Sequence, residues 1–162
     1  MLMWIIEDTR QQEGQHETKH KHFQEHDIQL IRCKLPFGDY ALPPKIAIDT
    51  KKGIKEIAGN ICGASAEHQR FKRECIAARD AGCKLIFLIE NDEGITSIDQ
   101  VHTWRNPRTI YSPNVVQGDR LEKAMKTMSK RYGCEFLFCN FDETAKKIME
   151  ILTDYEHGRR SN

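Results

Sequence analysis

The chain has 162 residues, of which 39% are hydrophobic and 30% are charged, and its formal net charge is +1. This length suffices for one domain with a buried core, and the composition is ordinary for a globular protein. No apolar run approaches the ~20 residues that a membrane span requires, so we expect no membrane partner. The near-neutral charge neither favours nor excludes nucleic acid, because basic residues can be concentrated on one surface.

Six cysteines are spread along the chain without any CxxC pair. Most lie inside apolar segments, where a free thiol behaves as a small hydrophobic group. This pattern favours reduced cysteines and a reducing compartment. The opening residues MLMWII are followed at once by Glu7 and Asp8, unlike a secretory signal.

The first half of the chain alternates predicted strands with polar segments. Residues 3–7 and 27–35 predict two strands. Between them, residues 10–26 are polar and rich in histidine, which predicts a helix or a loop leading into one. After a turn at 36–38, residues 45–50 predict a third strand, because isoleucines alternate there with alanine and aspartate.

Helices dominate the second half of the chain. They are predicted over residues 53–61, 66–81, 119–132 and 142–155, the last three with apolar stripes at helical spacing. Asp119 and Asp142 are expected to cap the last two helices at their N-termini. Gly82 and Gly133 are placed to end the second and third.

Two nearly continuous apolar runs, at residues 84–90 and 134–139, predict strands that are covered on both faces. Helices that alternate with buried strands indicate an α/β fold. Residues 91–118 are irregular and rich in Pro, Asn and Arg, so we expect a functional loop there.

Acidic and basic residues gather at the end of the strand over 45–50. Asp49 and Lys51 lie two residues apart, hence on one face of the strand, and Asp39 follows a glycine one loop earlier. Two carboxylates at neighbouring strand ends can share Mg²⁺, which prefers oxygen ligands and also takes phosphate oxygens. A lysine beside them can orient water or stabilise charge on a phosphate transition state. Alone, a D-x-K pattern is common, and a solvated strand end would be the favoured explanation.

Four segments in order resemble the XPF-type nuclease domain, a branch of the PD-(D/E)xK superfamily. They are EDTRQ, FGDY, IDTKK and QRFKRE, the last of which precedes the run LIFLIE. The resemblance extends to the C-terminal EFLFC and ETAKKIMEIL and covers nearly the whole chain. It identifies, as positions matching the motifs, Asp8, Arg10, Asp39, Asp49, Lys51, Arg70 and Glu74.

The resemblance implies a restriction-endonuclease-like α/β fold, with a mixed central sheet flanked by helices, over residues 1–156 and a frayed tail over 157–162. It also implies a DNA endonuclease that depends on Mg²⁺ or Mn²⁺ and leaves 5′-phosphate and 3′-hydroxyl ends, on branched or flap DNA among other substrates. The implied catalytic residues are Asp8, Asp39, Asp49, Lys51 and Glu74. The implied DNA-binding residues are Arg10, Lys52, Arg70, Arg105 and Arg108, and the implied metal ligands are Asp39, Asp49 and Thr50.

The sequence departs from the family pattern at several positions. Asp49, Thr50 and Glu74 stand where the family has glutamate, arginine and glutamine, and Gln11 replaces a glutamate. The tandem helix-hairpin-helix module of many relatives does not follow, so junction specificity does not carry over directly. The chain therefore resembles phage or prophage versions, which predicts the cytoplasm of a bacterial or phage-infected cell.

Each site residue also has a simpler interpretation. Asp8 could cap a following helix, since D-T-R-Q resembles a helix start. Arg70 could form an ion pair with Glu67 or Glu74, and Glu74 could lie on an exposed helical face. Trp104 could stack on nucleic acid beside Arg105 and Arg108, or anchor a long loop on the core.

Partners and function leave further alternatives open. His16, His20, His22 and His26 form two H-x₃-H pairs that could bind Zn²⁺, although a solvated helical face is the favoured interpretation. A homodimer is expected from the C-terminal helices. The alternative to a nuclease is a catalytically inactive nuclease-fold protein that binds DNA or a partner, which the intact D…DxK set disfavours.

Overall fold

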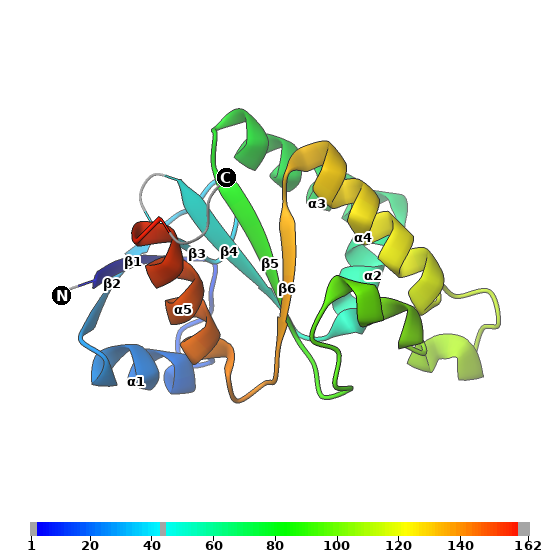
Figure 1. The fold of residues 1–162 in the computed structure, drawn as a ribbon, viewed down its shortest axis with the longest axis horizontal. Helices are drawn as coiled ribbons and strands as arrows, with labels where there is room; N and C mark the ends of the chain where they lie inside the picture. The colour runs from blue at the N-terminus through cyan, green and yellow to red at the C-terminus, as the bar shows by residue number, and fades with distance from the viewer. Residues whose placement is uncertain (1–2, 43–44, 159–162) are drawn as a thin grey trace.

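Six strands form one mixed sheet through the centre of the molecule (Figure 1). The structure is a computed structural model that describes residues 3–42 and 45–158. The strand order is β2-β1-β3-β4-β5-β6, and β3 runs antiparallel to both neighbours whereas the other pairs are parallel. The strands are β1 (Met3–Asp8), β2 (Ile28–Cys33), β3 (Tyr40–Leu42), β4 (Ile46–Lys51), β5 (Lys84–Glu90) and β6 (Glu135–Cys139).

Helices cover both faces of this sheet (Figure 1). One face packs against α2 (Ile54–Cys62), α3 (Ser65–Asp80) and α4 (Gly118–Tyr132). The other face packs against α1 (Glu17–Glu25) and α5 (Thr144–Glu156). The predicted α/β fold with a covered mixed sheet is confirmed. None of the described helices has the length and hydropathy to cross a membrane.

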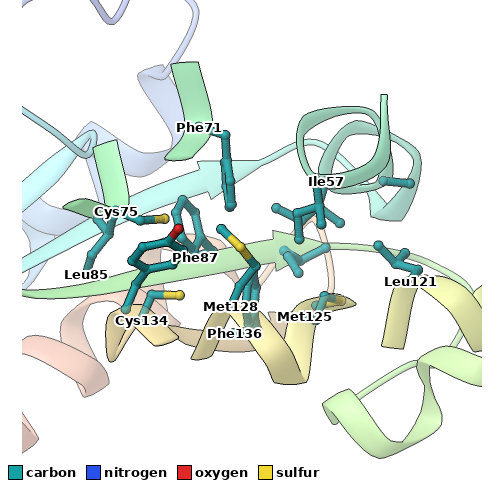
Figure 2. Close-up of a cluster of buried hydrophobic side chains, with 14 of the residues drawn as sticks. Ile57, Phe71, Cys75, Leu85, Phe87, Leu121, Met125, Met128, Cys134 and Phe136 are labelled. Carbon is teal, nitrogen blue, oxygen red and sulfur yellow. The ribbon is translucent and has the colours of Figure 1, made fainter. Parts of the chain in front are cut away.

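Aromatic rings form the centre of the core on the α2–α4 face. Phe87 of β5 is fully buried, and its ring centroid lies 4.6 Å from that of Phe71 and 5.3 Å from that of Phe136 (Figure 2). Trp104 packs into the same core with 3% of its surface exposed. Trp104 therefore anchors the loop between β5 and α4, as the simpler interpretation predicted, and offers no surface for stacking on nucleic acid.

Some local predictions were wrong. The strand β3 was missed, and the segment before α4 contains two short 3₁₀ helices, η1 (Ile98–Thr103) and η2 (Pro107–Ile110). Asp119 lies inside the first turn of α4 and does not cap it, because the N-cap position belongs to Gln117. The last helix begins at Thr144, after an N-cap at Glu143, so Asp142 does not cap it. Of the predicted tail, residues 159–162 lie outside the described residues.

The start of α4 is pressed against η1. A Cβ atom on Gly118 would clash with the carbonyl oxygen of Val101 and would lie 2.8 Å from the carbonyl oxygens of His102 and Trp104. These neighbours are backbone atoms, which cannot move aside as a flexible side chain can. The contact fixes where α4 begins relative to the loop that Trp104 anchors.

Gly118→Ala is expected to reduce the free energy of unfolding by about 1–3 kcal/mol, because the added methyl group overpacks this contact. Gly59→Ala is the matched control, since a Cβ atom on Gly59 in α2 meets open space. There, alanine should raise stability by about 0.5–1 kcal/mol through its higher helix propensity. Urea unfolding measures both, and equal effects of the two substitutions would contradict the packing.

Candidate active site

A cavity of about 690 Å³ opens where β4 ends, on the face of the sheet that α2 and α3 cover. It brings together residues from β4, from α3 and from the turn before β3. Four of the predicted catalytic residues line it, namely Asp39, Asp49, Lys51 and Glu74. The chain therefore folds three separate motifs into one polar site.

The turn before β3 fixes Asp39. Gly38 has φ +74°, and a Cβ atom there would lie 3.1 Å from the Cβ atom of Ala47, so glycine suits both the conformation and the space. The backbone N–H of Asp39 donates to the carbonyl oxygen of Ile48 over 2.7 Å. Its Oδ2 accepts hydrogen bonds from the backbone N–H of Thr50 at 2.8 Å and from Thr50 Oγ1 at 2.9 Å.

Asp49 and Lys51 form a buried ion pair on β4. Lys51 Nζ lies 3.2 Å from Asp49 Oδ1, and each residue is 7% exposed. The lysine ammonium also lies 5.7 Å from the ring centroid of Phe87 and 6.0 Å from that of Phe71. The two charges therefore sit between the aromatic core and the cavity.

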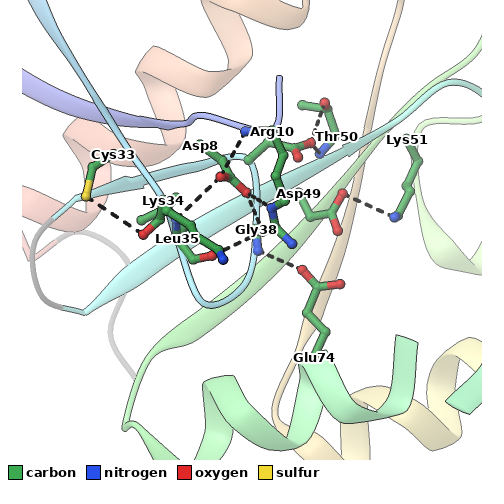
Figure 3. A network of polar contacts seen from close by, with 11 residues as sticks. Asp8, Arg10, Cys33, Lys34, Leu35, Gly38, Asp49, Thr50, Lys51 and Glu74 are labelled. Carbon is green, nitrogen blue, oxygen red and sulfur yellow. Dashed lines mark hydrogen bonds and ion pairs between the residues drawn. The ribbon is translucent and has the colours of Figure 1, made fainter. Parts of the chain in front are cut away.

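Glu74 joins α3 to the turn that carries Asp39. Its Oε1 accepts a hydrogen bond of 2.6 Å from the backbone N–H of Gly38 (Figure 3). The Glu74 side chain thus points from its helix toward the sheet and into the cavity, rather than lying on an exposed helical face.

The charges in the cavity perturb one another. Burial raises the pKa of Asp49 well above its usual range, Lys51 lowers it, and the nearby carboxylates of Asp39 and Glu74 raise it further. Burial alone would lower the pKa of Lys51, but Asp49, Glu74 and Glu56 outweigh burial and raise that pKa. Lys51 therefore carries its proton, and the surrounding carboxylates outnumber it.

Asp8 lies at the end of β1 and is 1% exposed, but it is not among the residues that line the cavity. Its carboxylate forms a close ion pair with Arg10 and accepts the backbone N–H of Leu35 at 3.4 Å (Figure 3). The capping interpretation is wrong, because the next helix begins only at Glu17. A catalytic role for Asp8 stays a prediction, and the contacts show that it holds Arg10 at the cavity rim.

The predicted DNA-binding residues divide into two groups. Arg10, Lys52 and Arg70 line the cavity. Arg70 also forms the predicted ion pair with Glu67, at 2.8 Å. Arg105 and Arg108 are exposed outside this cavity.

Among the further residues that line the cavity, sequence reasoning missed Asn60, Arg73 and His16 as parts of the site. Helical spacing could have found two of them, because Asn60 lies one turn beyond Glu56 on α2 and Arg73 one turn beyond Arg70 on α3. His16 was considered only as a member of a histidine pair. Burial lowers the pKa of His16, with a smaller contribution from Lys19.

The remaining histidines contact other groups. The Nε2 atom of His20 lies 2.6 Å from the buried carboxylate of Glu7, and the rings of His22 and His26 stack with centroids 4.3 Å apart. Within residues 3–42 and 45–158, no group of three or more His, Cys, Asp or Glu side chains is arranged to hold a metal ion. Neither histidine pair gains the further ligands that a zinc site needs.

The donor atoms of the cavity nevertheless fit a hard divalent cation. Asp39 Oδ1 and Asp49 Oδ2 make no hydrogen bond to any described residue, so each carboxylate keeps one oxygen available. Mg²⁺ is commonly held by one or two carboxylates, with water and substrate phosphate as the other ligands. A cation would also offset the excess of carboxylates over Lys51.

Comparisons with known proteins agree with the fold. The fold is similar to XPF from Aeropyrum pernix, with a TM-score of 0.63, 15% identity and coverage of 96% of this chain and 66% of that chain. It is also similar to XPF from Aeropyrum pernix in complex with DNA, with a TM-score of 0.67, 16% identity and coverage of 99% and 68%. The chain thus spans about two thirds of the length of these structures. No curated protein matches the sequence.

The model of the ERCC4 domain matches residues 7–151, a span that contains every residue lining the cavity. The match confirms the resemblance to XPF-type domains that the four motifs predicted. The chain belongs to the ERCC4 domain family.

Proposed function

We propose that the protein is a metal-dependent endonuclease that hydrolyses phosphodiester bonds in DNA. The observation that carries this proposal is the convergence of Asp39, Asp49, Lys51 and Glu74 on one open cavity. Family membership and the similarity to a DNA complex of XPF support DNA as the substrate. Cleavage of branched or flap DNA is part of the proposal, and a panel of single strands, flaps, forks and four-way junctions tests it.

Asp39 and Asp49 would hold Mg²⁺ or Mn²⁺ through their available oxygens, with Thr50 beside them. A bound cation supplies Lewis-acid polarisation of the scissile phosphate. Thr50 keeps Asp39 in place by donating two hydrogen bonds to its other oxygen. Glu74 holds the turn at Gly38, so it positions Asp39 from the opposite side.

Lys51 stabilises the negative charge that develops on the phosphate as the bond breaks. Its proton is held by the surrounding carboxylates, and its Nζ atom is fixed between Asp49 and two aromatic rings. A charge that is already positioned costs no reorganisation during the reaction. Arg10, Arg70 and Arg73 at the rim supply cations for the phosphates on either side.

Association of two copies is also proposed, through the C-terminal surface. The apolar stripes of α4 and α5, which were expected to supply both core and interface, lie in the two cores on opposite faces of the sheet, so we place the proposed contact on the strand between them. Strand β6 lies at the sheet edge between these helices, and an edge strand can pair with another chain. Phe141, 52% exposed, follows it.

Lys51→Met is expected to reduce turnover by about 10²-fold, because it removes one preorganised charge while keeping the aliphatic stem against the aromatic rings. The control is Lys52→Ala, at the exposed neighbouring position. It should raise KM and leave kcat nearly unchanged, since it removes only a phosphate contact. Steady-state cleavage assays separate the two effects, and wild-type turnover by Lys51→Met would rule out the assigned role.

Asp39→Asn tests the cation site without relying on cleavage alone. Millimolar Mg²⁺ or Mn²⁺ should raise the Tm of the wild-type protein, because ligand binding to the native state stabilises it. Asp39→Asn should abolish both the Tm shift and cleavage. Asp142→Asn, at an exposed position that lines neither the cavity nor its rim, should retain both. Normal cleavage by Asp39→Asn would contradict the two-carboxylate cation site, whereas a wild-type protein that binds DNA without cleaving it would favour a non-catalytic nuclease-fold protein.

Light scattering tests the association of two copies. A dimer is expected at tens of micromolar protein, and Phe141→Asp should weaken it because a charge replaces an exposed apolar side chain beside β6. A monomer under these conditions would contradict the proposed pairing.

A further inference from the structure

A second cavity of about 660 Å³ adjoins the active-site cavity along α2. The two cavities share three lining residues, Lys52, Glu56 and Asn60. We call the second one the α2 cavity. Its other walls come from residues 106–116, which include η2, from the turn between α2 and α3, and from the first turns of α3 and α4. A polymeric ligand bound in the active-site cavity can therefore extend into the α2 cavity.

Unpaired cations line the α2 cavity. Its four basic residues, Lys52, Lys55, Arg108 and Arg120, form no side-chain ion pair with any residue in the described ranges. Its two acidic residues are already engaged, since Glu67 pairs with Arg70 and Glu56 accepts the backbone N–H of Lys52 at 2.7 Å. The cavity thus presents net positive charge, which suits phosphate groups.

The outer wall of the α2 cavity is held in place by buried amides. Asn106 is 6% exposed, and its Nδ2 donates to the carbonyl oxygen of Val116 over 2.9 Å while its Oδ1 accepts the backbone N–H of Arg108 at 3.0 Å. Gln117 Oε1 accepts the backbone N–H of Asn106 at 3.2 Å. These bonds fix the backbone that carries Arg108 in the wall of the cavity.

Asn60 forms the wall between the two cavities and carries an unsatisfied acceptor. It is 7% exposed, and its Oδ1 is buried without a hydrogen-bond partner among the described residues. A buried amide oxygen without a partner costs free energy, and most such groups in proteins are paired. Because the Asn60 side chain lines both cavities, a rotation of its amide toward a ligand that brings an N–H donor would remove that cost.

We propose that the α2 cavity binds an unpaired nucleotide of the DNA strand, next to the phosphate at the active site. The inference rests on the proposed function and adds a second binding position to it. The four cations contact the backbone phosphates, and the Asn60 amide bonds to an N–H group on the base edge. Every base carries such a donor on its Watson–Crick edge, so the position is tolerant of sequence.

Binding at Asn60 selects against paired bases. In a duplex the donors of the Watson–Crick edge are already used by the opposite strand, and stacking keeps the base within the helix. A single strand has both the free edge and the freedom to turn one base into a cavity. The α2 cavity therefore favours DNA whose bases are unpaired beside the cleavage position.

The experiment measures equilibrium binding by fluorescence anisotropy in EDTA, with a labelled 12-nucleotide single strand and the blunt duplex of the same sequence. Asn60→Leu should reduce affinity for the single strand by about five-fold, the effect of one hydrogen bond. Its Tm should equal or exceed that of wild type, because leucine fills the site without an unpaired oxygen. Affinity for the duplex should change by less than about two-fold, since no paired base reaches this wall.

Lys55→Ala/Arg120→Ala tests the phosphate contacts independently of Asn60. Loss of two contacts should reduce the slope of log K against log salt by about 1.4 for the single strand. The matched control is Lys123→Ala/Lys130→Ala, which removes two exposed lysines of α4 outside both cavities and should leave that slope unchanged.

The outcomes separate this inference from the proposed function. The α2 cavity is overturned as a nucleotide site if neither Asn60→Leu nor Lys55→Ala/Arg120→Ala changes the single-strand affinity or the salt slope. This holds even if Asp39→Asn abolishes cleavage. Equal losses of affinity for the single strand and the duplex in Asn60→Leu also overturn it, because they indicate general attraction to phosphate. Selective loss on the single strand supports it, whatever the result for Asp39→Asn.

Discussion

The buried ion pair between Asp49 and Lys51 is the constraint around which the site is built. Two charges removed from water are costly unless each is paired and further contacts compensate. Here the pair lies at the end of β4, with aromatic rings of the core on one side and a polar cavity on the other. Removing one partner would leave the other charge buried without compensation. The pair can therefore be kept only together with the strand, the core and the cavity that surround it.

Asp39 and Glu74 add negative charge beside this pair, and neither forms an ion pair with any residue in the described ranges. Both are instead fixed by hydrogen bonds that link separate elements, Asp39 to the backbone of β4 and Glu74 to the turn at Gly38. These hydrogen bonds hold the carboxylates next to one another in spite of their mutual repulsion. Such an arrangement is characteristic of sites that take up a cation or a proton during function.

Periodicity and composition predicted most of the fold. Between Lys84 and Glu90 the run at β5 is apolar and buried on both faces, so its length and hydrophobicity were sufficient to identify it. Strand β3 was missed because three residues cannot establish an alternation, and its pairing with β1 and β4 depends on contacts distant in sequence. The predicted N-caps at Asp119 and Asp142 were wrong because an aspartate near a helix start is only a weak signal of where the first turn begins. The predicted end of α4 at Gly133 is confirmed.

The candidate site was predictable to the extent that its motifs lie at strand ends. Asp39, Asp49 and Lys51 could be grouped because neighbouring strands bring their ends to one edge of the sheet. The position of Asp8, outside the cavity and paired with Arg10, could not be predicted. It depends on a hydrogen bond from the backbone N–H of Leu35, which is distant in sequence. The α2 cavity could not be predicted from the sequence, because its walls come from segments that are close only after folding.

Glu7 and Asp8 are consecutive residues of β1, and their side chains lie on opposite faces of the sheet. Glu7 contacts Arg32 and His20 on the α1 side, whereas Asp8 faces the opposite side with Arg10. In β4 the same alternation places Asp49 and Lys51 toward the cavity and Ile48 in the other core. An insertion or deletion of one residue within β4 would exchange these faces and bury isoleucine in the cavity. Length variation among related sequences should therefore be confined to loops between the elements, while the strands keep their phase.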